Sequence, residues 1–237
     1  MLQSEYMSVM EAKSEEDFRA EIIRFAQRLG FQTVSATIVF DHLLGDSDFI
    51  NVDNASESYR RTRFLNHEIG RRDPVMQHCR FKSLPIIWGQ STYVASGQGD
   101  LWEEQAPYGY CNGIAMALHM PEGRHFMLGA ERDQAMPEDT VELTRMVADL
   151  QLLTVHAQEA AARIFMPPTV KPAVTLTPRE LEAMRWTMEG KTAWEVGNIL
   201  GISERTAVLH VNNAMHKLGC INKHQAVLKA LRMGVLR

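Results

Sequence analysis

The 237-residue chain carries a net charge of −4 and is 45% hydrophobic, which is enough apolar sequence for two domains with separate cores. Its three cysteines, Cys79, Cys111 and Cys220, are widely spaced, which argues against a disulfide framework or a zinc site and favours a reducing cytoplasm. The N-terminus lacks the apolar core of a signal peptide, and no run approaches the roughly 18 apolar residues of a membrane span, so we expect a soluble, cytoplasmic protein without a membrane partner.

Helix and strand patterns alternate through the first part of the chain. Residues 15–29 predict an amphipathic helix that stops at Gly30, because apolar side chains recur at helical spacing. The Gly45-Asp46 turn separates two predicted strands, 31–40 and 48–52. The remaining predicted elements are a helix at 56–69, a short helix from Asp73-Pro74 to Cys79, a strand at 84–88, a helix within 101–110, strands at 113–120 and 124–132, and a helix from Pro137 to about Ile164.

This order of elements predicts a domain over residues 1–165 that contains one antiparallel or mixed sheet with helices on both faces. Residues 166–173 are rich in proline and show no periodicity, so they predict an interdomain linker. The remaining segment, 174–237, holds nine Lys or Arg and five Asp or Glu, a net charge of +4, and the rest of the chain therefore carries −8. The basic segment is the candidate for a nucleic-acid partner.

Three helical runs with start and stop signals follow one another in the basic segment. Thr177 and Pro178 begin the first run, and Gly201 ends the second. Ser203 can cap a third helix over 204–218. Two helices joined by a short turn that contains glycine form the helix-turn-helix pattern, so we expect an all-α C-terminal domain over 174–237.

The third helix has two contrasting faces. One face carries four apolar residues that can pack on the other helices: Ala207, Val211, Ala214 and Leu218. The opposite face combines a guanidinium, amides and exposed methyl groups, which suit the base edges and thymine methyls of a DNA major groove. An ordinary solvated helix face is the alternative, but the preceding helix and turn favour double-stranded DNA. The residues predicted to contact DNA on this face are Arg205, Thr206, Val208, Leu209, Asn212 and Asn213.

The C-terminal segment resembles the DNA-binding domain of LuxR-type regulators over nearly all of the last sixty residues. Thr192, Ser203 and Lys217 also match the family and complete the predicted DNA-contact set. The other matching residues are Leu176, Thr177, Arg179, Glu180, Gly190-Lys191, Glu195, Ile199-Leu200, Ile202, Thr206, His210, Asn213, Leu218, Asn222 and Ala226.

The N-terminal segment resembles the autoinducer-binding domain of the quorum-sensing members of that family. The match rests on Asp73-Pro74-Val75, Pro85, Trp88, Trp102 and Gly113. The two resemblances together imply an α/β/α sandwich that encloses an N-acyl-homoserine lactone or a related small-molecule signal. They also imply a homodimeric activator that binds a dyad-symmetric promoter element. RNA polymerase is a further candidate partner.

The sequence departs from the family ahead of Asp73. Members that bind acyl-homoserine lactones carry a Trp and a Tyr four residues apart, and here these positions fall on Arg60 and Phe64. A phenylalanine cannot supply the hydroxyl bond, and an arginine in an apolar pocket needs a partner anion. A shift of one residue would bring Tyr59 into the position of the Trp. The departures leave a different acyl signal, or none, as an alternative.

Asp73 is the main candidate for ligand recognition, because a semi-buried carboxylate accepts strongly from an amide N–H. Its alternative role is to cap the helix that Pro74 opens, and the two roles can coexist. The other candidate ligand contacts are mostly aromatic residues that fit a pocket wall or an ordinary core, and they are Tyr59, Phe64, Val75, Trp88, Trp102, Tyr110 and Gly113.

No catalytic or metal-binding residue is predicted. His119, His125 and His156 lack metal-ligand spacing, and the sequence contains neither a nucleophile elbow nor a phosphate loop. No cofactor is therefore expected besides the small-molecule signal. A response regulator is a second class of function, but Asp41 stands alone where an acidic pair is required. An enzyme or a non-responsive scaffold with a DNA-binding tail is the third.

The C-terminal helix at 224–232 and the long helix at 138–164 are candidates for a dimer interface. In the long helix, the apolar residues at helical spacing fit either a dimer seam or the core of one domain, and they are Leu143, Met146, Leu150, Leu153 and Val155.

Overall fold

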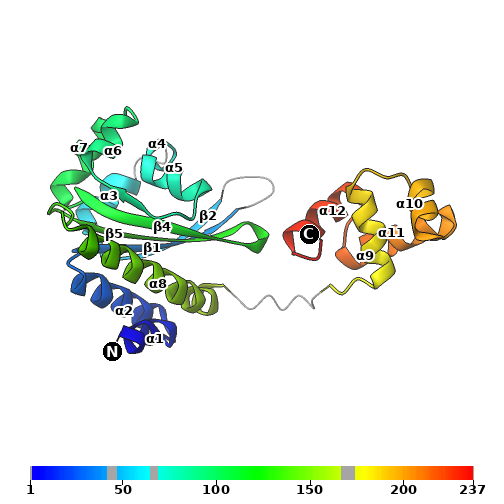
Figure 1. Ribbon diagram of the computed structural model, residues 1–237, viewed down its shortest axis with the longest axis horizontal. Helices are drawn as coiled ribbons and strands as arrows, with labels where there is room; N and C mark the ends of the chain where they lie inside the picture. The colour runs from blue at the N-terminus through cyan, green and yellow to red at the C-terminus, as the bar shows by residue number, and fades with distance from the viewer. Residues whose placement is uncertain (1, 42–46, 65–68, 167–173, 237) are drawn as a thin grey trace. The chain divides into compact units, whose positions relative to one another are not determined.

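The computed structural model describes residues 2–41, 47–64, 69–166 and 174–236, which form an N-terminal and a C-terminal unit (Figure 1). Among these residues, no helix is both long enough and apolar enough to cross a membrane. The predicted turn at Gly45-Asp46, residues 65–68 of the predicted helix at 56–69, and residues 167–173 of the predicted linker lie outside the described residues.

The N-terminal unit is built on a five-stranded sheet with the strand order β2-β1-β5-β4-β3. Every neighbouring pair of strands is antiparallel. The central hairpin pairs Met120 with Arg124 across a short turn. The strands are β1 (Thr33–Phe40), β2 (Asp48–Asp53), β3 (Ile86–Trp88), β4 (Asn112–Met120) and β5 (Arg124–Arg132).

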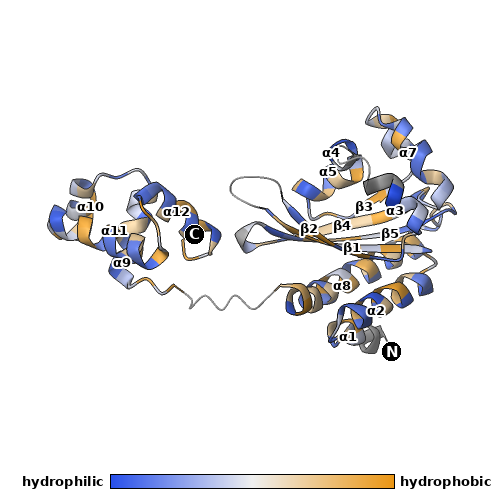
Figure 2. Cartoon of the chain, turned by 180° about the vertical axis from the view of Figure 1, so that it is seen from behind, coloured by the Kyte–Doolittle hydropathy of each residue, from blue (hydrophilic) through white to orange (hydrophobic). Residues whose placement is uncertain are grey.

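Helices cover both faces of this sheet, as predicted. Along β1 the apolar residues Val34, Ala36 and Ile38 alternate with polar ones, and they belong to the larger buried core. That core lies between the sheet and the helices α1 (Leu2–Met10), α2 (Glu15–Arg28) and α8 (Thr140–Phe165). Hydrophilic and hydrophobic residues alternate along α2 and α8, as expected of amphipathic helices (Figure 2).

A smaller core on the other face joins the sheet to a layer of short helices. This layer contains α3 (Glu57–Phe64), α4 (Ile69–Arg72), α5 (Pro74–Phe81), α6 (Gln90–Ala95), α7 (Gly99–Gln105) and the 3-10 turn Ala106–Tyr108. Figure 1 shows the short helices and the long pair, α2 and α8, on opposite sides of the sheet. The unit is therefore an α/β/α sandwich, and its fold class agrees with the prediction.

Several helices differ from the prediction. α1 was not predicted, although Tyr6 and Val9 bury its apolar face. α4 runs through Gly70, where the predicted helix ended, and α6 is only six residues long. The long helix begins at Thr140 rather than Pro137, because the Asp139 side chain accepts a hydrogen bond from the backbone amide of Val141 and caps the helix there.

Most of the apolar residues of the long helix take the second of their two expected roles, the core of one domain. Met146, Leu150 and Leu153 are buried in the core of their own domain, and Leu143 packs against that core. The three buried residues are therefore closed to a second chain, whereas Leu143 is half-buried. Val155 is exposed, together with Val141 and Leu152.

The C-terminal unit consists of α9 (Pro178–Met188), α10 (Ala193–Leu200), α11 (Glu204–Leu218) and α12 (Lys223–Arg232). Thr177 and Thr192 each form a reciprocal capping box with the glutamate three residues later. Ser203 caps α11, and Gly201 ends α10 at a φ of +67° in the left-handed region that glycine adopts readily. The helix-turn-helix predicted from the sequence is therefore present.

Candidate functional site

A cavity of about 60 Å³ lies between the sheet and the layer of short helices. Of the eight predicted ligand residues, four line this cavity: Asp73, Val75, Trp88 and Tyr110. The sequence did not single out the other lining residues, which are Ser35, Thr37, Met76, Cys79, Tyr93, Gln105, Ala115, Met127, Leu128, Gly129 and Glu131.

Asp73 lies at the N-terminus of α5 and at the cavity wall. Its Oδ1 accepts hydrogen bonds from the backbone amides of Val75 at 2.8 Å and Met76 at 3.2 Å. The hydroxyl of Tyr93 donates to the same oxygen at 3.2 Å. The capping role is thus present, and it fixes the buried carboxylate beside the cavity, where it can also accept from a ligand.

Trp88 and Gly113 occupy paired positions on β3 and β4. A Cβ added at Gly113 would lie 2.7 Å from the indole ring of Trp88 and 2.7 Å from the backbone oxygen of Ala130. Gly113 does not line the cavity. The missing side chain at Gly113 leaves room for the indole ring of Trp88, which does line the cavity.

Two other predicted aromatic residues support the cavity wall rather than line it. Tyr59 is buried and stacks on the cavity residue Tyr110 with ring centroids 4.0 Å apart. Trp102 packs against the smaller core, and its indole N–H donates to the backbone oxygen of Cys111 at 2.9 Å. Phe64 ends α3, and its side chain lies outside what the structure describes.

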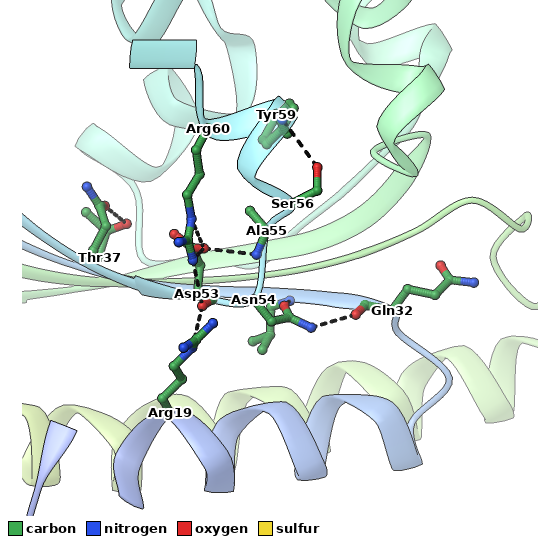
Figure 3. Close-up of polar contacts among 11 residues, drawn as sticks. Arg19, Gln32, Thr37, Asp53, Asn54, Ala55, Ser56, Tyr59 and Arg60 are labelled. Carbon is green, nitrogen blue, oxygen red and sulfur yellow. Dashed lines mark hydrogen bonds and ion pairs between the residues drawn. The ribbon is translucent and has the colours of Figure 1, made fainter. Parts of the chain in front are cut away.

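Arg60, which stands where members that bind acyl-homoserine lactones carry a Trp, pairs with the carboxylate of Asp53. Arg60 Nη2 lies 2.5 Å from Asp53 Oδ1, and Arg60 Nε donates to the same oxygen at 3.0 Å. Arg19 reaches the backbone oxygen of Asp53 from α2 (Figure 3). Arg60 and its neighbour Tyr59 point in different directions, so the guanidinium pairs with the end of β2 and does not line the cavity.

The residues that the sequence reasoning missed include Glu131, Gln105 and Cys79. Burial raises the pKa of the Cys79 thiol to about 12, and the nearby Asp73 carboxylate adds to the rise, so Cys79 is an apolar wall rather than a nucleophile. The alternation of β5 contained a usable signal: Met127 and Glu131 share one face of the strand with Gly129, and all three line the cavity.

The predicted DNA-contact face of α11 is open to solvent. Leu209 is 55% exposed, and Arg205, Val208, Asn212 and Asn213 are also exposed, whereas Thr206 is half-buried. Within the described part of the chain, no residue bonds to the side chains of Arg205, Asn212 or Asn213. The opposite face is buried at Ala207, Ala214 and Leu218, as predicted. The polar groups are therefore available for a partner.

The three remaining predicted DNA residues have structural partners. The Thr192 hydroxyl donates to Glu195 at 2.9 Å, and Ser203 Oγ accepts from the backbone amide of Thr206 at 3.1 Å. Lys217 Nζ donates to Glu180 Oε2 at 2.7 Å. Lys217 thereby ties α11 to α9, and contacts of these three residues with DNA stay predictions.

Two family models match the chain, one for each unit. The autoinducer binding domain matches residues 14–161, and the model of bacterial regulatory proteins of the luxR family matches residues 174–230. The chain belongs to the LuxR family of transcriptional regulators, with an autoinducer-binding domain followed by a DNA-binding domain. This is a family of regulators and not of enzymes.

Curated relatives and solved structures resemble the chain over most of its length. Transcriptional activator protein AnoR of Acinetobacter nosocomialis is 28% identical over 236 residues, which are 99% of this chain and 98% of that protein. Transcriptional activator protein SolR of Ralstonia nicotianae is 36% identical over 181 residues, 76% of this chain and 73% of that protein.

Among solved structures, Escherichia coli SdiA has a TM-score of 0.73 at 24% identity and covers 100% of this chain and 98% of that one. The N-acylhomoserine lactone dependent factor CepR2 of Burkholderia cenocepacia has a TM-score of 0.61 at 20% identity, with 70% of this chain and 96% of that one covered. These two likenesses agree with the observed fold.

The response-regulator alternative does not fit the structure. Its receiver domain requires a parallel sheet, whereas every strand pair here is antiparallel. Asp41 follows β1 and accepts hydrogen bonds from Ser47 at 2.6 Å and from His125 at 2.8 Å.

Proposed function

We propose that this regulator binds an N-acyl-homoserine lactone or a related acylated signal in the cavity of its N-terminal domain. The observation that supports the proposal best is the buried carboxylate of Asp73, which is fixed at the wall of a cavity that Trp88 and Tyr110 also line. Its lining combines aliphatic and aromatic side chains with fixed polar groups, which suits an acyl chain that ends in a polar head.

We also propose that the liganded protein binds a dyad-symmetric promoter as a homodimer. Paired recognition helices would then enter major grooves about 34 Å apart, one turn of DNA. Exposed apolar side chains on two helices offer surfaces for the second copy, and these are Val141, Leu152 and Val155 on α8 and Leu228 and Leu231 on α12. The relatives are named activators, so we also propose RNA polymerase as a partner.

Ligand binding would couple to DNA binding through the stability of the folded N-terminal domain. A ligand that binds only the folded state stabilises it by mass action, by about 2.7 kcal/mol when its concentration is 100 times Kd. A folded N-terminal domain then presents the dimer surface that aligns two copies of α11. A regulator that needs no signal is the second candidate. The Arg60 position favours it, because members that bind acyl-homoserine lactones carry a Trp there.

Selection from a library of random duplex DNA tests the proposal. The full chain is incubated with the library with and without N-octanoyl-homoserine lactone, and bound sequences are read. The proposal expects inverted half-sites about one DNA turn apart, enriched only with the lactone. Equal enrichment without the lactone would favour the non-responsive regulator, and a single half-site would contradict the homodimer.

The variant Asp73→Ala serves to connect the cavity to that response. In the full chain it should abolish the enrichment of half-sites by the lactone, while the isolated 174–237 fragment should still bind DNA, because it contains α11 and not the cavity. An unaltered lactone response in this variant would remove Asp73 from the ligand site.

A further inference from the structure

The cavity contains a second buried carboxylate, which the resemblance to the family did not bring forward. Glu131 on β5 is 6% exposed and Asp73 before α5 is 4% exposed, and both line the cavity. They approach it from different layers, since β5 belongs to the sheet and Asp73 to the layer of short helices. Among the described lining residues none is basic, so the cavity favours hydrogen-bond donors and disfavours anions.

Gly129 makes the space that the Glu131 carboxylate occupies. A Cβ added at Gly129 would lie 2.5 Å from Glu131 Oε1 and 3.1 Å from Ser35 Oγ. The carboxylate therefore folds back over the strand next to Ser35, on the cavity face of the sheet, instead of extending into solvent. A carboxylate accepts up to about four hydrogen bonds, so it can take a ligand donor in addition to the protein's own.

Two buried donors in the same cavity need acceptors. Trp88 Nε1 and Gln105 Nε2 have no hydrogen-bond partner among the described residues, and the two residues are 5% and 8% exposed. Both residues line the cavity. Buried N–H groups without partners are rare in folded proteins and are usually explained by a water or a ligand. A ligand that brings two acceptors to this cavity would satisfy both.

We propose that Glu131 is a specificity-determining residue that accepts a hydroxyl of the ligand while Asp73 accepts a second donor. Trp88 and Gln105 donate to the ligand's carbonyl oxygens. The ligand class is an acyl compound that carries a hydroxyl within a few bonds of its acyl carbonyl, because both carboxylates and both donors line the same cavity. This inference rests on the proposed function of the cavity as the signal site.

Two sources can supply this chemistry, and one set of probes distinguishes them. The hydroxyl can lie on the acyl chain, as in N-(3-hydroxyoctanoyl)-homoserine lactone, or on the head group, as in 1-octanoylglycerol. The matched probes that lack this hydroxyl are N-(3-oxooctanoyl)-homoserine lactone and N-octanoyl-homoserine lactone. Octanoate tests whether the cavity excludes anions. Calorimetric titration of the full chain with each probe gives its Kd.

At least one hydroxyl-bearing probe should bind about tenfold or more tightly than both lactones without a hydroxyl, as expected for a hydrogen bond to a buried carboxylate. The preference should disappear in Glu131→Leu and weaken in the more conservative Glu131→Gln. It should survive in Glu103→Gln, a matched control at an exposed glutamate of α7 that does not line the cavity. Whichever hydroxyl-bearing probe binds more tightly identifies the source.

The two ways of failing are distinct. If no lactone and no acylglycerol binds the wild-type chain, the proposed function fails and this inference falls with it. If lactones bind, but those without a hydroxyl bind as tightly as the others, only the role of Glu131 is refuted. The same holds if octanoate binds best or if folded Glu131→Gln and Glu131→Leu keep the full preference.

Discussion

Replacing Lys217 by methionine should destabilise the C-terminal unit, because this lysine holds α11 against α9. Lys217 Nζ lies 2.7 Å from Glu180 Oε2, and the two side chains are 38% and 5% exposed. Removing one partner of a fully buried ion pair costs about 3–5 kcal/mol. An exposed pair contributes about 0–1 kcal/mol. Only the glutamate is buried here, so we expect a loss of about 2 kcal/mol in the free energy of unfolding.

The effect of Lys217 should depend on pH in a defined direction. Burial opposes the charged form of Glu180, but the hydrogen bonds from Lys217 and Thr177 and the charge of Lys217 outweigh it, so the pKa of Glu180 is lowered. A lowered pKa in the folded state means that the ion pair stabilises fully above the ordinary pKa of glutamate. Its contribution is lost as the pH falls through the lowered pKa of the folded state.

Hydrogen-exchange mass spectrometry of the full chain in increasing urea measures this loss, because it reports residues 174–236 separately from the N-terminal unit. The matched control is Lys191→Met, which breaks the exposed pair of Lys191 with Glu195 at 3.7 Å. The control should lose little stability, because both of its partners are exposed and solvent screens their attraction. The reasoning is refuted if both variants lose the same stability. A folded Lys217→Met that binds all DNA more weakly with a shallower salt dependence would instead make Lys217 a phosphate contact.

Three further predictions concern the two sites. Arg205→Ala or Asn212→Ala should weaken DNA binding by about 1–3 kcal/mol and relax the sequence preference. Fluorescence anisotropy on matched and mismatched DNA sites measures both effects. Equal weakening on every sequence would mean that these side chains contact only phosphate. Gly113→Ala should lower the free energy of unfolding by about 1–3 kcal/mol, because its Cβ meets the Trp88 ring and a backbone oxygen. In urea titrations Gly99→Ala, whose Cβ meets Val94 at 3.7 Å, should be nearly neutral, and a similar loss in both would refute the packing argument. Cys79, with its pKa raised to about 12, should resist iodoacetamide at pH 8 in the folded protein, and rapid alkylation detected by mass spectrometry would contradict its burial.

The C-terminal domain could be predicted almost completely because its signals are local. Thr177, Thr192 and Ser203 cap their helices through bonds to residues three positions later, and the glycine at 201 ends α10. Such bonds depend on a few neighbouring residues, which the sequence displays directly. The face of α11 followed from helical periodicity alone.

The cavity could be predicted only in part because its residues meet through tertiary packing. Asp73 and Trp88 were found through motifs, but Glu131 lies near the end of β5, where a charged residue usually reaches solvent. Its burial depends on the absence of a side chain at Gly129 and on the helices that cover this face. The sheet order also brings β5 between β1 and β4, which periodicity along one strand cannot reveal.

Native mass spectrometry of the full chain tests most directly whether the N-terminal domain is a signal receptor. The protein is expressed in a host supplied with a mixed pool of acyl-homoserine lactones and is sprayed from a volatile buffer. The account predicts one added mass per chain that matches an acyl-lactone, and loss of this mass in Asp73→Ala. A wild-type chain that carries no added mass from the same pool, while folded and able to bind DNA, would contradict it.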